Sequence, residues 1–177
     1  MLKKVVVIGP ESTGKSTLCQ MLAEHYGTLW CPEYARQWLL DHGRHYTYPD
    51  LLSIAQGQLA LEDAHSQQVF ASGQSLLFLD TDMQVMKVWC EYVFNDCHTW
   101  ILNRLAERPY DLYLLCRPDL PWVQDELREY PDERPRQELY HIYREMMTEQ
   151  RVPWADISGD YNQRFQLAVQ AVQQWVL

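Results

Sequence analysis

Apolar residues follow two patterns along the chain. Short runs of aliphatic and β-branched residues have the length of buried strands, and they occupy residues 3–8, 28–31, 75–79, 112–116 and 154–157. Between these runs apolar residues recur every three or four positions, which is typical of amphipathic helices. The helices predicted in this way cover residues 15–26, a segment around 38–39, 50–71, 84–94, a stretch ending at 107, 138–150 and 162–176. Because strands alternate with helices, the pattern predicts an α/β sandwich of three layers with a five-stranded parallel sheet.

Turn and capping residues set the expected limits of these elements. Gly27 is a suitable C-terminal stop for the first helix, and Asp50 is the expected N-cap of the long helix that follows. The stretch 117–136 is rich in proline and charge, so we expect an irregular excursion there. The chain is therefore predicted to be a single domain, residues 1–177, with a lid insertion at about 117–136.

A glycine-rich stretch, Gly-Pro-Glu-Ser-Thr-Gly-Lys-Ser-Thr at residues 9–17, connects the first strand to the first helix. It matches the phosphate-binding P-loop, G-x-x-x-x-G-K-[ST], in the strand–loop–helix context that this motif requires. Backbone N–H groups of such a loop bind phosphate oxygens, so the stretch predicts a P-loop NTPase fold that binds ATP. The residues expected to bind ATP here are Gly9, Glu11, Ser12, Thr13, Gly14, Lys15, Ser16 and Thr17. Lys15 is also expected to stabilise the transferring phosphoryl group, and Ser16 to ligate Mg²⁺.

Further polar residues follow the other predicted strands. The carboxyl ends of parallel strands meet at one edge of a sheet, so Glu33, Asp80, Asp82 and Arg117 are expected beside the P-loop. We predict that Asp80 ligates Mg²⁺, and that Glu33 or Asp82 orients or deprotonates an acceptor hydroxyl as a catalytic residue. Alternatives remain open at this point: Asp80 and Asp82 also suit helix capping, and Glu33 also suits a surface pair with Arg36.

Arginines in the stretch 117–136 predict an Arg-rich lid. Arg128 and Arg134 are the candidates for catalytic cations that close over the phosphates, and Arg117 is a candidate for binding ATP. The alternative is a solvated polar loop with internal salt bridges. Five aromatic residues are also expected near the acceptor pocket, although any one of them suits a place in the core better than a ligand contact: Trp30, Tyr34, Trp38, Trp89 and Tyr92.

Composition narrows the classes of partner. A net charge of −9 over 177 residues disfavours binding to nucleic acid or to an anionic membrane, and no apolar run has the length of a membrane span. The N-terminus leads directly into a strand, so no targeting segment is expected. Five scattered cysteines indicate reduced thiols and a cytoplasmic protein. The expected partner is a small molecule, and the oligomeric state stays open.

Four segments together resemble the kinase domain of NadR-type proteins, ribosylnicotinamide kinases grouped with the AAA-type P-loop ATPases. They are residues 9–17, Pro-Glu-Tyr-Ala-Arg at 32–36, Asp-Thr-Asp at 80–82 and the stretch 114–128, and the similarity continues to Ile-Ser-Gly-Asp-Tyr-Asn-Gln-Arg at 157–164. The resemblance implies transfer of the ATP γ-phosphate to the 5′-hydroxyl of nicotinamide riboside, a step of NAD biosynthesis. The adenylyltransferase domain and DNA-binding segment of full-length NadR proteins are not expected within these residues. Two alternatives remain: a kinase of another nucleoside or small metabolite, and a nucleotide-binding regulatory ATPase.

Overall fold

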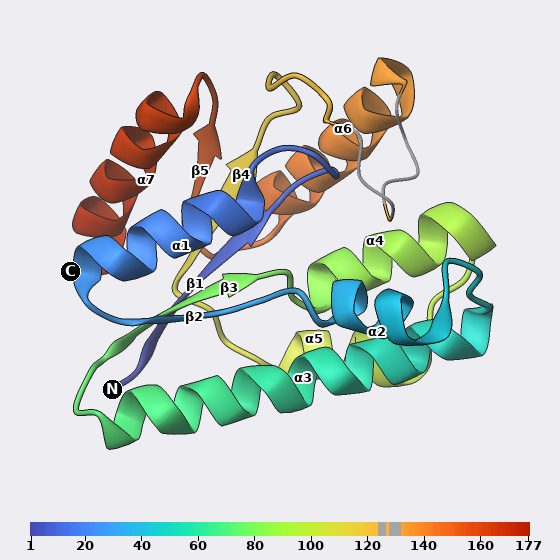
Figure 1. Ribbon diagram of the computed structural model, residues 1–177, viewed down its shortest axis with the longest axis horizontal. Coiled ribbons are helices and arrows are strands. Elements are labelled where there is room, and N and C mark those ends of the chain that lie inside the picture. The colour runs from blue at the N-terminus through green and yellow to red at the C-terminus, as the bar shows by residue number, and fades with distance from the viewer. Residues whose placement is uncertain (124–126, 128–131) are drawn as a thin grey trace.

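A parallel sheet lies between two helical layers in the computed structural model, which describes residues 1–123, 127 and 132–177 (Figure 1). The strands of this sheet are β1 (Lys3–Ile8), β2 (Leu29–Cys31), β3 (Leu76–Asp80), β4 (Leu112–Cys116) and β5 (Trp154–Ile157). The helices are α1 (Lys15–Tyr26), α2 (Tyr34–His42), α3 (Tyr48–Ala71), α4 (Met83–Phe94), α5 (Thr99–Glu107), α6 (Glu133–Glu149) and α7 (Tyr161–Trp175). Within the described part of the chain, no helix is both long enough and apolar enough to cross a membrane.

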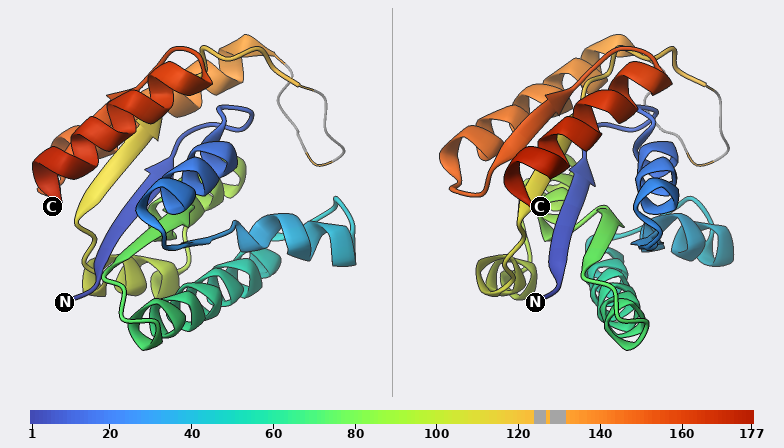
Figure 2. Two further views of the ribbon diagram at one scale, coloured as in Figure 1. Left: turned by 60° about the vertical axis from the view of Figure 1, so that its left-hand side comes forward. Right: turned by 90° about the vertical axis from the view of Figure 1, so that its left-hand side faces the viewer.

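The five strands are ordered β2-β3-β1-β4-β5, and every neighbouring pair is parallel. β1 is therefore central, with Val6 opposite Leu79 of β3 and Tyr113 of β4. Figure 2 shows α1 and α7 together on one face of the sheet, with the remaining helical layer on the other. The predicted five-stranded parallel α/β sandwich is confirmed.

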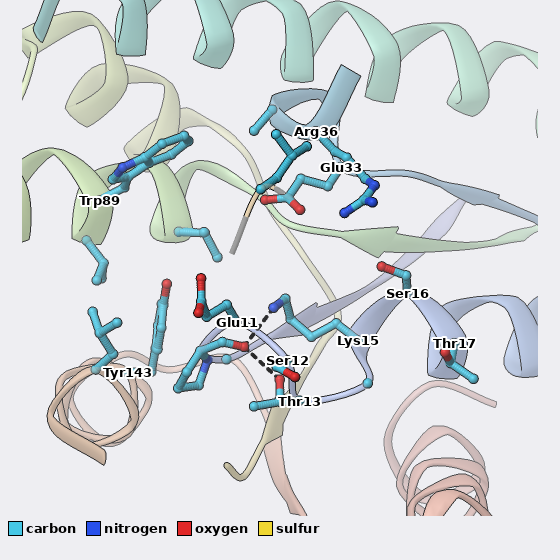
Figure 3. A pocket seen from close by; sticks show the side chains of 18 of the residues that line it. Glu11, Ser12, Thr13, Lys15, Ser16, Thr17, Glu33, Arg36, Trp89 and Tyr143 are labelled. Atoms are coloured by element: carbon cyan, nitrogen blue, oxygen red, sulfur yellow. Dashed lines mark hydrogen bonds between the residues drawn. The ribbon is translucent and has the colours of Figure 1, made fainter. Parts of the chain in front are cut away.

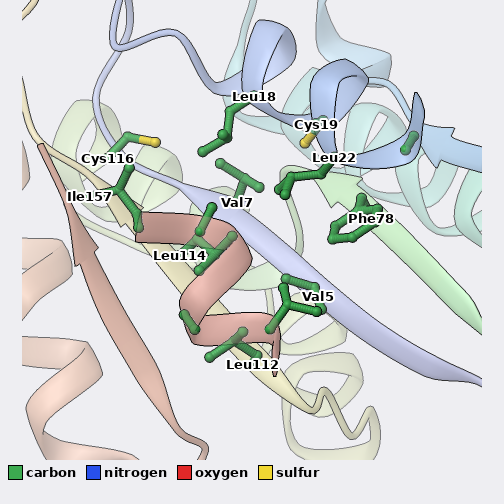
Figure 4. Close-up of a cluster of buried hydrophobic side chains, with 14 of the residues drawn as sticks. Val5, Val7, Leu18, Cys19, Leu22, Phe78, Leu112, Leu114, Cys116 and Ile157 are labelled. Carbon is green, nitrogen blue, oxygen red and sulfur yellow. The ribbon is translucent and has the colours of Figure 1, made fainter. Parts of the chain in front are cut away.

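Burial on both faces explains the apolar runs. Val5 and Val7 pack with α1 and α7 in the cluster of Figure 4, whereas Val6 and Ile8 pack with side chains of α3, α4 and α6. All four side chains are fully buried. Because successive residues of a strand point to opposite faces, a strand covered on both sides must be apolar at every position. This central strand ends directly at the P-loop and gives that loop a rigid base.

Two helices begin two or more residues earlier than the sequence predicts. α3 begins at Tyr48 with Thr47 as its N-cap, and Asp50 takes the third helical position, where its carboxylate accepts a hydrogen bond of 2.7 Å from Thr47 N. α6 begins at Glu133 instead of residue 138, because Pro135 lies in its first turn, where the missing N–H costs no helical hydrogen bond. The expected excursion is correspondingly shorter at its C-terminal end.

Candidate active site

The P-loop is held in shape by its own side chains and by the end of β4. A Cβ atom at Gly9, where φ is +141°, would lie 2.6 Å from Cys116 O, so only glycine allows this close approach. Thr13 Oγ1 donates a hydrogen bond of 2.8 Å to Pro10 O, and Lys15 Nζ donates one of 2.9 Å to the same oxygen (Figure 3). The lysine thus lies across the loop that is expected to bind phosphate.

Arg164 of α7 supports the P-loop from behind, a role that the sequence analysis did not assign. Its guanidinium is buried, and it donates hydrogen bonds to Thr13 O at 3.0 Å, Arg117 O at 2.9 Å and Gly159 O at 2.7 Å. It also forms an ion pair with Asp119. One side chain therefore ties together the loops that follow β1, β4 and β5. The sequence signal was the segment 157–164, which ends at this arginine.

Ser16 and Asp80 form a pair of oxygen donors beside the P-loop. Ser16 Oγ donates a hydrogen bond to Asp80 Oδ2, while the buried Oδ1 of Asp80 has no hydrogen-bond partner among the described residues. Burial raises the pKa of Asp80, and the charge of Lys15 opposes this shift. Hard oxygen donors of this kind fit Mg²⁺. The described residues contain no group of three or more His, Cys, Asp or Glu side chains that could hold a metal.

A cavity of about 310 Å³ opens between the P-loop, α2, α4 and α6. This volume is at the lower end of the range for small-molecule sites. Figure 3 shows Glu33 and Arg36 facing the P-loop across the cavity, with Trp89 and Tyr143 extending from two different helices. The cavity therefore joins a phosphate-binding loop to a carboxylate and two aromatic rings.

Glu33 is the carboxylate at the centre of this arrangement. It occupies the N-cap position of α2, but within the described residues its side chain makes no capping hydrogen bond. Burial raises the pKa of Glu33 to about 7, and the negative charge of Asp80 adds to this shift, whereas Lys15 and Arg36 oppose it. A carboxyl with a pKa near 7 is suited to accept a proton at neutral pH.

Asp82 is placed differently. Its Oδ1 accepts hydrogen bonds from Gln84 N at 2.9 Å and Val85 N at 3.2 Å, and its Oδ2 accepts one of 2.7 Å from the Tyr113 hydroxyl. The side chain is fully buried and lies outside the set of described residues that line the cavity. The structure therefore gives Asp82 the capping role that the sequence left open as an alternative, whereas Glu33 is the one of the two predicted carboxylates that lines the cavity.

We expect Asp82→Ala to lower stability without a selective effect on catalysis. The substitution removes the cap of α4 and leaves the buried Tyr113 hydroxyl unpaired, so unfolding in urea should show a loss of about 1–3 kcal/mol. Turnover measured well below the melting temperature should remain within about twofold. Asp82→Asn, which keeps an acceptor oxygen for the cap, should lose less stability. A tenfold loss of turnover in a fully folded Asp82→Asn protein would instead indicate a catalytic role.

Two described arginines of the expected lid, Arg117 and Arg134, form local ion pairs. Arg117 pairs with Asp156 of β5 and its guanidinium lies 5.8 Å from the centre of the Tyr140 ring, and Arg134 pairs with Glu138. Both lie outside the set of described residues that line the cavity, and Arg128 falls outside the described residues. The Arg-rich lid is therefore not confirmed, and its roles for Arg117, Arg128 and Arg134 stay predictions.

The first part of the same stretch does contact the P-loop. Trp122 Nε1 donates a hydrogen bond of 3.3 Å to Glu11 Oε1, and Val123 N donates one of 3.2 Å to Ser12 Oγ. Leu127 also lines the cavity. The stretch therefore covers the phosphate-binding loop through a tryptophan and backbone groups.

The aromatic residues that were expected near the acceptor pocket lie in different parts of the structure. Trp89 and Tyr92 line the cavity, whereas Trp38 stacks on His42 at 4.3 Å between ring centres. Trp30 packs against the core cluster that joins the sheet to α1 and α7. Tyr143 of α6, which the sequence analysis did not assign to the site, also lines the cavity.

A P-loop at the end of the central strand, in a parallel sheet of this order, defines a P-loop protein with a kinase-like fold. The comparison with protein families agrees. The chain belongs to the AAA domain family, which matches residues 4–164.

The chain is also homologous to NadR proteins. It is 29% identical over 181 aligned residues to the trifunctional NAD biosynthesis/regulator protein NadR of Escherichia coli (strain K12), and 28% identical to that of Salmonella typhimurium. Each alignment covers 98% of this chain and 42% of the relative, so the chain spans about two-fifths of the length of these proteins.

Solved structures share the fold. A NadR protein in complex with NR matches with a TM-score of 0.82 and 22% identity, over 98% of this chain and 49% of that one. A NadR protein in complex with NAD and AMP-PNP matches with a TM-score of 0.76 and 24% identity, over the same shares. Deoxyadenosine kinase from M. mycoides with bound dATP matches with a TM-score of 0.59 and 12% identity, over 97% of this chain and 99% of that one.

Proposed function

We propose that this protein transfers the γ-phosphoryl group of ATP to the 5′-hydroxyl of nicotinamide riboside. The observation that carries the proposal is that one cavity holds all of these groups: Glu33 faces the P-loop lysine across it, and Trp89 and Tyr143 lie on its walls. Homology to NadR supports a phosphotransferase, as does the fold shared with NadR and deoxyadenosine kinase structures. The size of the cavity suits a small-molecule acceptor.

The proposed reaction uses the P-loop and Glu33 from opposite sides. ATP binds with its phosphates on the P-loop, and Lys15 exchanges its hydrogen bond to Pro10 O for phosphate oxygens. Ser16 and Asp80 would hold Mg²⁺, which when bound neutralises phosphate charge. The acceptor oxygen forms a bond to the γ-phosphorus as the bond to the β–γ bridging oxygen breaks, so that ADP leaves with that electron pair. Glu33 accepts the proton of the acceptor hydroxyl late in the reaction.

Aromatic rings and negative charge favour a cationic acceptor. Trp89 Nε1 donates a hydrogen bond of 2.8 Å to the Tyr46 hydroxyl, which fixes the indole at the cavity wall. Tyr143 reaches the cavity from α6, and Glu11 also lines it. Aromatic faces attract cations, and nearby carboxylates strengthen this preference for a pyridinium ring. One solved NadR structure is a complex with NR, which supports the same assignment.

A comparison of acceptors tests the proposal. We expect kcat/KM for the acceptor, measured by ADP release, to be at least tenfold higher for nicotinamide riboside than for uridine, cytidine or adenosine. Of these four acceptors, only nicotinamide riboside carries a cationic ring. The product should be identified as the 5′-monophosphate by mass spectrometry. Trp89→Leu should reduce this preference while leaving the KM for ATP unchanged. A preference for an uncharged nucleoside would overturn the acceptor assignment.

The deoxyadenosine kinase likeness, which extends over 97% of the chain, keeps a different nucleoside as the second candidate acceptor. The same acceptor panel separates these two cases. ADP release that is independent of every acceptor would instead indicate a regulatory ATPase.

A further inference from the structure

A buried amide outside the cavity holds the turn that carries Glu33. Gln58 lies in the middle of α3, and its side chain is only 1% exposed. Its Oε1 accepts a hydrogen bond of 2.7 Å from Tyr34 N, and its Nε2 donates one of 3.4 Å to Pro32 O. The Nε2 atom also lies 3.8 Å from Cys31 Sγ at the end of β2.

These contacts secure both peptide groups that flank Glu33. Pro32 O belongs to the peptide bond before the Glu33 Cα atom, and Tyr34 N belongs to the peptide bond after it. A single rigid amide that binds both groups restrains the φ and ψ angles between them, and so the direction in which the Glu33 side chain leaves the backbone. The Glu33 backbone is extended, at φ −67° and ψ 116°.

One of these contacts also satisfies the first N–H group of α2. The first N–H groups of a helix lack helical partners, and an N-cap side chain accepts from the second or third of them, so the first needs another acceptor. In α2 the N–H of Tyr34 is satisfied by Gln58 from another helix. Glu33 occupies the N-cap position without a capping hydrogen bond among the described residues, and its carboxylate is directed to the cavity (Figure 3).

Gly57 brings the two helices close enough for this arrangement. A Cβ atom at Gly57 would lie 2.0 Å from Cε1 of Tyr34, so the tyrosine ring occupies the space where a side chain would be. Glycine inside a helix costs about 1 kcal/mol relative to alanine, so the close packing gives this residue a reason to be present.

We propose that Gln58, together with Gly57, is a positioning residue that holds Glu33 towards the acceptor hydroxyl. The inference rests on the proposed role of Glu33, but it concerns residues that do not touch the substrate. In this arrangement the long helix α3 sets the direction of a carboxylate that is carried by the β2–α2 turn. The groups that face Glu33 electrostatically are Asp80, Lys15, Arg36 and Glu11.

Gln58→Met tests the inference, because it removes both hydrogen bonds while keeping a side chain of similar length. We expect kcat with the acceptor to fall by about 10- to 100-fold, with the KM for ATP within about twofold of the wild-type value. Gln56→Met is the matched control, since Gln56 is exposed on the same helix, and it should change neither quantity. If Gln58→Met folds poorly, Gly57→Ala supplies a second route, because it displaces the Tyr34 ring and should give the same pattern.

A double-mutant cycle separates positioning from general stability. In a Glu33→Gln background, Gln58→Met should lower kcat by less than about twofold further, because its effect acts through the carboxylate. Equal fractional losses in both backgrounds, or loss of ATP affinity alone, would overturn the inference.

A second readout does not depend on turnover. The carboxyl carbon of Glu33, identified in NMR spectra by its loss in Glu33→Gln, should titrate at lower pH in Gln58→Met, because a loosened turn lets the carboxylate reach water. An unchanged titration would overturn the inference even if no acceptor were phosphorylated. A wild-type protein without kinase activity but with this shift would overturn only the proposed function.

Discussion

Lys15→Ala is expected to reduce turnover by about 10²- to 10³-fold, because a lost electrostatic donor to the transferring phosphoryl group typically costs that much. The lysine makes its described hydrogen bond to Pro10 O within the P-loop, at 2.9 Å, and is only partly buried. The fold should therefore tolerate the change. The measurement is steady-state ADP release with saturating acceptor, together with thermal unfolding by circular dichroism.

Lys87→Ala is the matched control for Lys15→Ala. Lys87 lies on α4 and pairs with Glu91 at 2.6 Å, one turn along the same helix. Its loss should leave turnover unchanged and stability within about 0.5 kcal/mol. Retention of more than about a tenth of the wild-type rate in Lys15→Ala, with the control normal, would contradict the role of this lysine in phosphoryl transfer.

Glu33→Gln is expected to lower acceptor turnover by about 10²-fold or more, because the amide cannot accept the proton of the hydroxyl. The raised pKa of about 7 predicts the pH dependence. Turnover in the wild type requires the ionised carboxylate, so the rate should rise with pH through about 7 and level off above it. The substitution should remove this rise while leaving ATP affinity, measured by calorimetry, nearly intact.

The Glu33 carboxyl also makes stability depend on pH. Stability should fall as pH rises, whereas turnover should rise. Its pKa in the folded protein lies above the ordinary value of 4.5, so the folded state binds the proton more tightly than the unfolded chain. The wild type should lose stability as pH rises from about 4.5 to 7, and Glu33→Gln should not. At pH 8 Glu33→Gln should be more stable than the wild type by roughly 1–2 kcal/mol. This figure is smaller than the full pKa shift would give, because the side chain is only half-buried. Equal unfolding curves at pH 8 would contradict the raised pKa.

Local sequence was sufficient to predict the framework of this site. The limits of α1 follow from the P-loop before it and Gly27 after it, and the structure places them at Lys15 and Tyr26. The apolar run that forms β3 indicated a strand covered on both faces, and every residue of that strand is buried. Such features depend on neighbours in sequence, so they can be recognised without knowing the tertiary structure.

Residues whose roles depend on distant partners could not be predicted in this way. Helix capping was an open alternative for both Asp80 and Asp82 in the sequence, but only the tertiary structure brings the Tyr113 hydroxyl of β4 to Asp82 in the interior. Tyr143 lies in an amphipathic stripe that reads as core, and only the packing of α6 beside α4 places its ring on a cavity. Arg164 and Gln58 likewise act on backbone groups of other elements, which no spacing rule indicates.

The central position of β1 has a consequence for how the protein is made. Its partners are β3 and β4, which a ribosome produces much later, and β2 offers it no pairing. Pairings between such distant segments form slowly, because a long stretch of chain must be ordered first. Gly9 in turn packs on the backbone of Cys116, the last residue of β4. The phosphate-binding loop thus leaves the ribosome before the strand on which it packs, so a nascent chain that ends before β4 lacks the backbone that holds Gly9 in place.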